Sequence, residues 1–114
     1  QDGKQSLYLI AEEGDTWISY QVDDQDIKRY VLKEGKRLFL QGDVILLFMG
    51  NLNATKIFLN NQLVQAETKT GVKSLIFPET VASNYELPLF PSYNGVPHTA
   101  KEYKEKMMEK ESSN

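Results

Sequence analysis

The fold of this chain is decided by the stretch Lys56-Ile57-Phe58-Leu59-Asn60-Asn61-Gln62-Leu63-Val64-Gln65. Two short apolar segments meet at Asn60-Asn61, and asparagine is the non-glycine residue that best tolerates a positive φ. A two-residue hairpin turn of the primed type needs that backbone geometry. The stretch therefore predicts a strand, a tight turn and a second strand.

Outward from this hairpin, strand-like runs alternate with turn residues about every ten positions. Residues 16–22 place Ile18, Tyr20 and Val22 on one face and the residues between them on the other. No run has helical periodicity, and the connections are too short for parallel crossovers. We therefore predict an all-β domain over residues 7–77, a small antiparallel sandwich of Ig-like or similar type with seven to eight strands.

The character of the chain changes after this domain. Four prolines, Pro78, Pro88, Pro91 and Pro97, punctuate the next twenty residues, and each fixes φ and removes a backbone donor. We predict an extended proline-rich arm over residues 78–98. Its apolar side chains suggest that it either folds back over its own sandwich, which we favour, or lies in a groove of a partner.

Thr99 and Glu102 form the pattern of a capping box, in which each side chain bonds to the backbone of the other residue. This pattern predicts a short charged C-terminal helix over residues 99–111. Together with the arm, the helix offers a means of self-association.

Composition excludes several classes of protein. The chain has 114 residues, a net charge of −3 and a pI near 5.1, which argues against the basic face that nucleic acid requires. Its longest apolar run is far shorter than the roughly 18 residues of a membrane helix. Without cysteine it has neither disulfides nor a thiolate metal site. Because it begins at Gln1 and not at methionine, we expect a processed or excised piece, with any anchor preceding it.

Neither catalytic nor metal-binding residues are predicted, and no cofactor is expected. His98 is the only histidine, it follows the β-region, and no Gly-x-Ser-x-Gly elbow is present. The acidic cluster Asp23, Asp24 and Asp26 lacks the spacing of a calcium loop. We interpret this cluster as a solvated turn.

Two groups of apolar side chains are candidates for binding. Trp17 is the only tryptophan, and it fits either a core position, which we favour, or an aromatic platform for a sugar ring or a partner. The arm alternates aromatic, aliphatic and proline residues, as partner-bound extended segments do. The candidates are Trp17, Tyr20 and Tyr30 on the strands, and Tyr85, Leu87, Leu89, Phe90 and Tyr93 in the arm.

Four sequence elements follow one another in a fixed order: Asp15-Thr16-Trp17-Ile18, Leu32-Lys33-Glu34-Gly35, Gly50-Asn51 and the hairpin of residues 57–64. Their order and spacing resemble the C-terminal domain of RodZ-like bacterial cell-shape proteins, over about residues 7–77. The chain departs from that pattern in two turns, where Asn60-Asn61 replaces Asn-Gly and Asp24-Gln25 replaces Asp-Gly. From residue 79 onward the family has no counterpart that we identify.

The resemblance implies a non-catalytic periplasmic domain of a single-pass inner-membrane protein that takes part in rod morphogenesis and peptidoglycan elongation. The parent protein would contact the actin-like filament MreB from its cytoplasmic side. The implied partner is a cell-envelope or wall-synthesis protein. Two alternatives stay open: a carbohydrate-binding β-module that holds peptidoglycan with exposed aromatic residues, and a self-association module.

Overall fold

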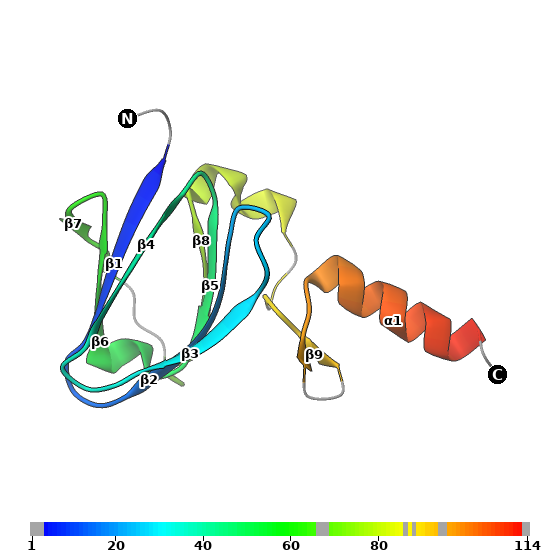
Figure 1. Ribbon diagram of the computed structural model, residues 1–114, viewed down its shortest axis with the longest axis horizontal. Helices are drawn as coiled ribbons and strands as arrows, with labels where there is room; N and C mark the ends of the chain where they lie inside the picture. Colours follow the sequence, from blue (N-terminus) through cyan, green and yellow to red (C-terminus); the bar gives the residue numbers. More distant parts are fainter. Residues whose placement is uncertain (1–3, 66–68, 86, 88, 94–95, 113–114) are drawn as a thin grey trace.

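Two four-stranded antiparallel sheets pack face to face in the computed structural model, which describes residues 4–65, 69–85, 87, 89–93 and 96–112 (Figure 1). In the first sheet the strand order is β4 (Arg37–Gly42), β1 (Gln5–Ala11), β6 (Thr55–Leu59) and β7 (Gln62–Leu63). In the second sheet it is β3 (Lys28–Leu32), β2 (Thr16–Val22), β5 (Ile45–Met49) and β8 (Lys73–Phe77). The predicted all-β sandwich is confirmed, with eight strands in the two sheets.

The core lies between the two sheets and is built from alternate residues of the strands other than β7. Leu7 and Leu9 of β1, Ile57 of β6 and Leu47 of β5 are almost wholly buried there. In β2, Ile18 points into this core, as the alternation predicts. Burial of such aliphatic side chains is worth about 1.5–3 kcal/mol each.

The turn between β6 and β7 has the backbone that the two asparagines predict. Asn60 has φ +52° and Asn61 has φ +70°, so both adopt the left-handed conformation of a primed turn. The Asn60 side chain also accepts a hydrogen bond of 2.9 Å from the backbone N–H of Ser6. The turn is therefore tied to β1 as well as to its own strands.

Residues from three of the four elements of the resemblance meet at one end of the sandwich, whereas the Asn60-Asn61 turn lies beside Ser6 at the other end. The Asp15 carboxylate accepts a hydrogen bond of 2.9 Å from the backbone N–H of Glu34, and the Asn51 side chain donates to the Asp15 carbonyl at 2.9 Å. The indole of Trp17 lies against Gly50, where an added Cβ would come within 2.3 Å of the ring. These residues therefore join three separate turns, and their role is structural.

The segment after β8 is not extended throughout, which corrects the predicted arm. A 3-10 helix, η2 (Glu79–Asn84), follows β8, and the short hairpin of β9 (Ser92–Tyr93) and β10 (Val96–Pro97) comes later. Residues 79–84 contain no proline, so their N–H groups remain free for local bonds such as that from Val81 to the Pro78 carbonyl at 3.2 Å. A similar short 3-10 helix, η1 (Leu52–Ala54), precedes β6.

The C-terminal helix α1 (Ala100–Ser112) begins at the predicted capping box. The Thr99 N–H donates to the Glu102 carboxylate at 3.0 Å, and the Glu102 N–H donates to the Thr99 hydroxyl at 3.1 Å. Both bonds satisfy donors that a helix start otherwise leaves open. The capping box is therefore confirmed.

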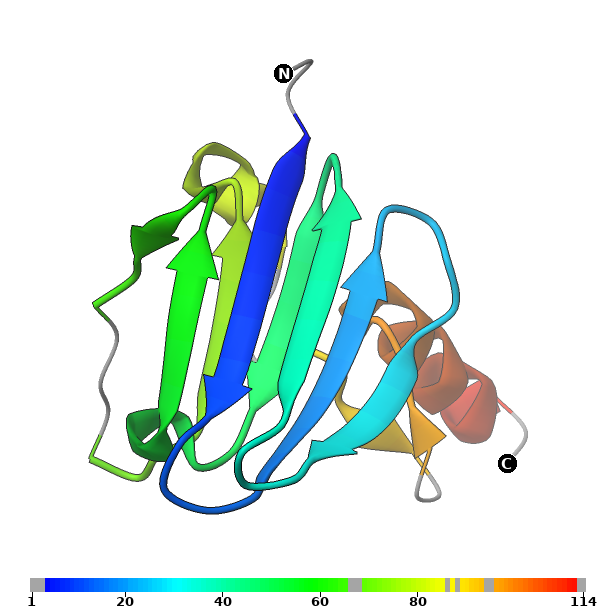
Figure 2. The ribbon, with the colours of Figure 1, turned by 60° about the vertical axis from the view of Figure 1, so that its left-hand side comes forward.

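Part of the arm folds back over its own sandwich. Leu89 and Phe90 are buried in a cluster with Leu46 and Ile76 on the outer face of the second sheet. The Leu89 N–H donates to the Ser74 hydroxyl of β8 at 3.0 Å. Of the two alternatives for the arm, self-docking is confirmed at these residues. In Figure 2, α1 and β9 lie on the side of the second sheet, whereas no segment that the structure describes lies over the outer face of the first sheet.

Candidate functional site

A row of apolar side chains crosses the outer face of the first sheet. Phe39 of β4, Tyr8 of β1, Phe58 of β6 and Leu63 of β7 are direct cross-strand neighbours, and we call these four residues the aromatic row. Phe39 is 57% exposed and Leu63 is 48% exposed. The rings of Tyr8 and Phe58 lie 6.2 Å apart between centroids and are tilted by 47°.

The local sequence explains why this face is apolar. Residues 7–10 are all apolar or aromatic, so when Leu7 and Leu9 fill the core, Tyr8 and Ile10 must point outward. The outer face of an antiparallel sheet is usually polar. An uncovered apolar face of this kind is a mark of an interaction surface.

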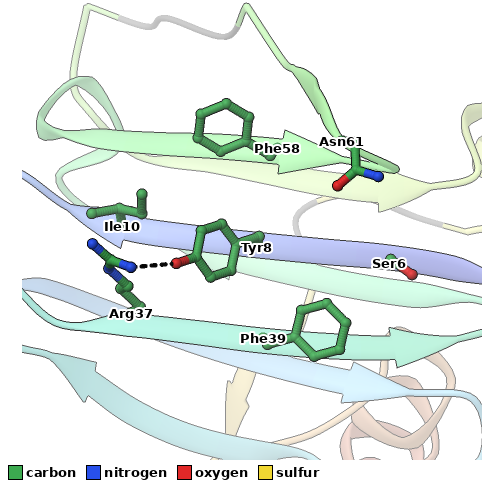
Figure 3. A pocket seen from close by; sticks show the side chains of 7 residues that line it. All are labelled: Ser6, Tyr8, Ile10, Arg37, Phe39, Phe58 and Asn61. Carbon is green, nitrogen blue, oxygen red and sulfur yellow. Dashed lines mark hydrogen bonds between the residues drawn. The ribbon is translucent and has the colours of Figure 1, made fainter.

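A positive charge lies beside the aromatic row. Arg37 stands next to Ile10 across the strands, and its guanidinium donates to the Tyr8 hydroxyl at 3.0 Å (Figure 3). Arg37 is exposed and, within the part of the chain that the structure describes, has no ion pair. By contrast, Lys56 on the far side of Ile10 pairs with Glu12 at 3.7 Å.

These side chains enclose a shallow depression of about 540 Å³. Figure 3 shows side chains from β4, β1 and β6 converging on it. The lining consists of Ser6, Tyr8, Ile10, Arg37, Phe39, Phe58 and Asn61, with no carboxylate among them. Phenyl rings, a phenol and a permanently charged guanidinium are suited to binding an apolar group next to a negative charge.

The described group with a resolved pKa shift lies away from this face. The carboxyl group of Asp15, at the end of the sandwich, has a pKa below its ordinary value of 3.8 because the Glu34 N–H donates to the carboxylate. Lys33 adds to this effect, and burial opposes it. Elsewhere in the described residues, no three His, Cys, Asp or Glu side chains come together as a metal site would require.

The three strand candidates from the sequence do not form one site. Trp17 is 50% exposed on the outer face of the second sheet, so the alternative of a core tryptophan is wrong. Its ring packs against Gly50 and lies 6.2 Å from that of Phe48.

The two tyrosine candidates lie on the other face of the second sheet. Tyr20 packs against the core. Tyr30, 45% exposed on edge strand β3, pairs with Ile18 and so shares the inner face.

The arm candidates are divided as well. Leu89 and Phe90 are buried against the second sheet, and Tyr85 is half-buried beside them. Leu87 is 64% exposed. The side chain of Tyr93 lies outside the part that the structure describes. Of the arm candidates whose side chains the structure describes, Leu87 is therefore the exposed one, and the other three pack on the second sheet.

Sequence reasoning missed Tyr8, Phe39, Phe58 and Arg37. One signal was present, because residues 7–10 and 38–40 are apolar without the alternation of a sheet with one wet face. The same signal occurs in residues 44–49, whose outward side chains the arm covers. The sequence thus marks two apolar outer faces but does not say which one the arm takes.

The fold and this face define a class: a small antiparallel β-sandwich with one exposed aromatic face. Comparisons of the chain with protein-family models, with curated proteins and with solved structures find no match. Within the described residues, no helix is long and apolar enough to cross a bilayer.

Proposed function

We propose that this chain is a non-catalytic binding domain that holds a protein partner on the aromatic row. One observation carries the proposal: four apolar side chains stand in register across a sheet face that no other described segment of the chain covers. On the other apolar outer face, Leu89 and Phe90 cover the part around Leu46 and Ile76. A contiguous apolar face left open is costly in water unless another molecule covers it.

The composition of the row favours a protein over a glycan. Phe39, Phe58 and Leu63 offer no hydrogen-bonding group, whereas sugar recognition needs polar partners for many hydroxyls. The rings of Tyr8 and Phe58 are tilted relative to each other, so they do not form the flat platform on which a sugar ring stacks. Aromatic residues with a neighbouring arginine are the composition that dominates protein interfaces.

For the biological setting, we propose the one that the RodZ-like resemblance implies. The domain would act in the periplasm as part of an inner-membrane-anchored cell-shape protein, and its partner would be a cell-envelope or wall-synthesis protein. The network of Asp15, Trp17, Glu34, Gly50 and Asn51 supports this proposal. These residues recur in that order because they contact one another at one end of the sandwich. A family that keeps its fold but has no catalytic site would share contacts of this kind.

Site-specific photo-crosslinking tests the proposed function. A photoreactive phenylalanine analogue replaces Phe39 in one protein and Val31 in another, because Val31 is 48% exposed but lies on the second sheet. In the cell envelope, we expect a defined protein adduct from position 39 and none from position 31. The adduct should weaken when Phe58→Ala is added. Equal adducts at both positions, or none at position 39, contradict the proposal.

Two further measurements separate the alternatives. We expect the purified chain to stay in the supernatant when sacculi are sedimented; pelleting that Phe39→Ala abolishes would identify a glycan-binding face instead. We expect a monomer mass in light scattering. A dimer that Phe39→Ala converts to a monomer would mean that the row binds a second copy of the chain.

A further inference from the structure

The aromatic row ends at an open strand edge. β4 is the outermost strand of the first sheet, and within the described residues its second side pairs with no strand. Leu38 points toward the core yet is only half-buried, which shows that this side of β4 is open to solvent. At the other end of the row, β7 has only two residues, too few to accept a partner strand.

The hydrogen-bond pattern shows which groups of β4 face the open side. The Ala11 N–H donates to the Lys36 carbonyl at 3.2 Å, and on the other side of β1 the Glu12 N–H donates to the Ala54 carbonyl at 2.9 Å. Backbone groups of an antiparallel strand alternate between its two neighbours. Hence Leu38 and Leu40 bond to β1, whereas the N–H and C=O groups of Arg37, Phe39 and Gln41 point away from the sheet.

The three residues whose backbone faces the open side also place their side chains on the outer face. Phe39, Tyr8 and Phe58 share one row, and Arg37 and Ile10 share the next. A fifth strand added at β4 would therefore extend both rows by one residue each. Its side chain opposite Phe39 would meet an exposed ring, and its side chain opposite Arg37 would meet a guanidinium without an ion pair among the described residues.

We infer that β4 accepts an extended, acidic peptide strand from the partner, which joins the first sheet as a fifth strand antiparallel to β4. This inference rests on the proposed function and names the partner's chemistry. The peptide carries an aromatic residue opposite Phe39 and an acidic residue opposite Arg37. Between them, facing inward beside Leu38, it carries an aliphatic residue. Main-chain hydrogen bonds supply affinity, and the two side-chain pairs supply specificity.

A synthetic peptide tests this directly on the whole chain. Its central residues are threonine, valine, phenylalanine, valine and glutamate, in the order that the antiparallel register with Gln41 through Arg37 requires. The control peptide has lysine in place of the glutamate. We expect the glutamate peptide to bind roughly three- to tenfold more tightly, given the worth of cross-strand charge pairs. In the variant Arg37→Glu the preference should reverse, and the same order of binding in both proteins overturns the inference.

Amide hydrogen exchange gives a second, independent readout. At saturating glutamate peptide, the amides of Phe39 and Gln41 should become protected. Those of Leu38 and Leu40 should be unchanged because they already bond to β1. Protection that does not alternate along β4, or that falls on β3 instead, overturns the inference.

A proline variant separates edge pairing from binding to the face. Gln41→Pro removes one outward N–H at a site where an edge strand tolerates proline. Gln41→Ala is the matched control, since both variants lose the 3.1 Å bond that the Gln41 side-chain amide donates to the Ser6 hydroxyl. We expect Gln41→Pro to weaken binding of the glutamate peptide and adduct formation at position 39 roughly tenfold relative to Gln41→Ala.

An adduct that survives Gln41→Pro, with no protection of the β4 amides by the peptide, leaves the proposed function standing and overturns the strand inference. Loss of the position-39 adduct in the otherwise unaltered chain instead counts against the proposed function.

Discussion

Replacement of Gly50 by alanine tests how Trp17 is held at the end of the sandwich. A Cβ at position 50 would lie 2.3 Å from Cζ2 and 2.4 Å from Cε2 of the indole, far inside the distance that two carbons accept. Gly50 does not have a positive φ, so alanine brings no backbone strain of its own. The indole must therefore move, and because it is 50% exposed it has solvent to move into.

The size of the effect follows from the covered half of the ring. A tryptophan buries roughly 200 Å² when fully covered, so the half-covered indole has about 100 Å² to lose. At about 25 cal/mol per Å² this limits the loss to about 2.5 kcal/mol. Replacement of glycine by alanine also stabilises the folded state by about 0.5–1 kcal/mol, because it lowers the conformational entropy of the unfolded chain. We expect Gly50→Ala to lower the free energy of unfolding by about 1–2 kcal/mol.

Urea unfolding followed by circular dichroism measures this change, and fluorescence reports its cause. Trp17 is the only tryptophan, so its native emission should shift to the red in Gly50→Ala. In a Trp17→Ala background the same substitution should cost nothing. The matched control is Gly35→Ala, at φ +83° with no atom within 4 Å of the added Cβ, whose backbone penalty should not depend on Trp17. An unshifted emission, or an equal loss of stability with and without the indole, would refute this reasoning.

Three further outcomes follow from single contacts. Leu89→Ala should cost about 2–3 kcal/mol in urea unfolding, whereas Leu87→Ala, at a side chain 64% exposed, should cost under about 0.5 kcal/mol; equal losses would mean that the arm is not docked. The pKa of Asp15 is lowered chiefly by the Glu34 N–H, so the bond stabilises the fold above pH 3.8 and this stabilisation is lost as the pH falls through the lowered pKa. In acid titrations of unfolding free energy, the difference between the wild type and Asp15→Asn should therefore be largest near neutral pH and vanish at low pH. Asn61→Ala should destabilise the hairpin by about 1 kcal/mol and Asn61→Gly should not, since Asn61 has φ +70°; identical melting of the two variants contradicts a primed turn.

Features that depend on neighbouring residues were predictable from the sequence. The Asn60-Asn61 turn and the capping box of Thr99 and Glu102 form as predicted, because each is fixed by φ preferences and by bonds across a few residues. Alternation also placed Ile18 and Trp17 on opposite faces of β2, although it did not say which face is buried. From such local rules the number of strands and the sandwich class follow.

Features that depend on distant segments were not predictable in this way. The space that Trp17 occupies exists because Gly50, which directly follows β5, has no side chain. The aromatic row joins Phe39, Tyr8 and Phe58 from three strands, and no local pattern reports that register.

By itself, the sequence determined that both outer faces of this sandwich are apolar, since consecutive apolar residues in a strand must face both ways. Only the tertiary structure decided which face stays open. Leu89 and Phe90 dock on Leu46 and Ile76, so the β5 and β8 part of the second sheet is covered, whereas no described segment covers Tyr8 and its row on the first sheet. That choice depends on where a segment after the last sandwich strand can reach, which is a property of the whole fold.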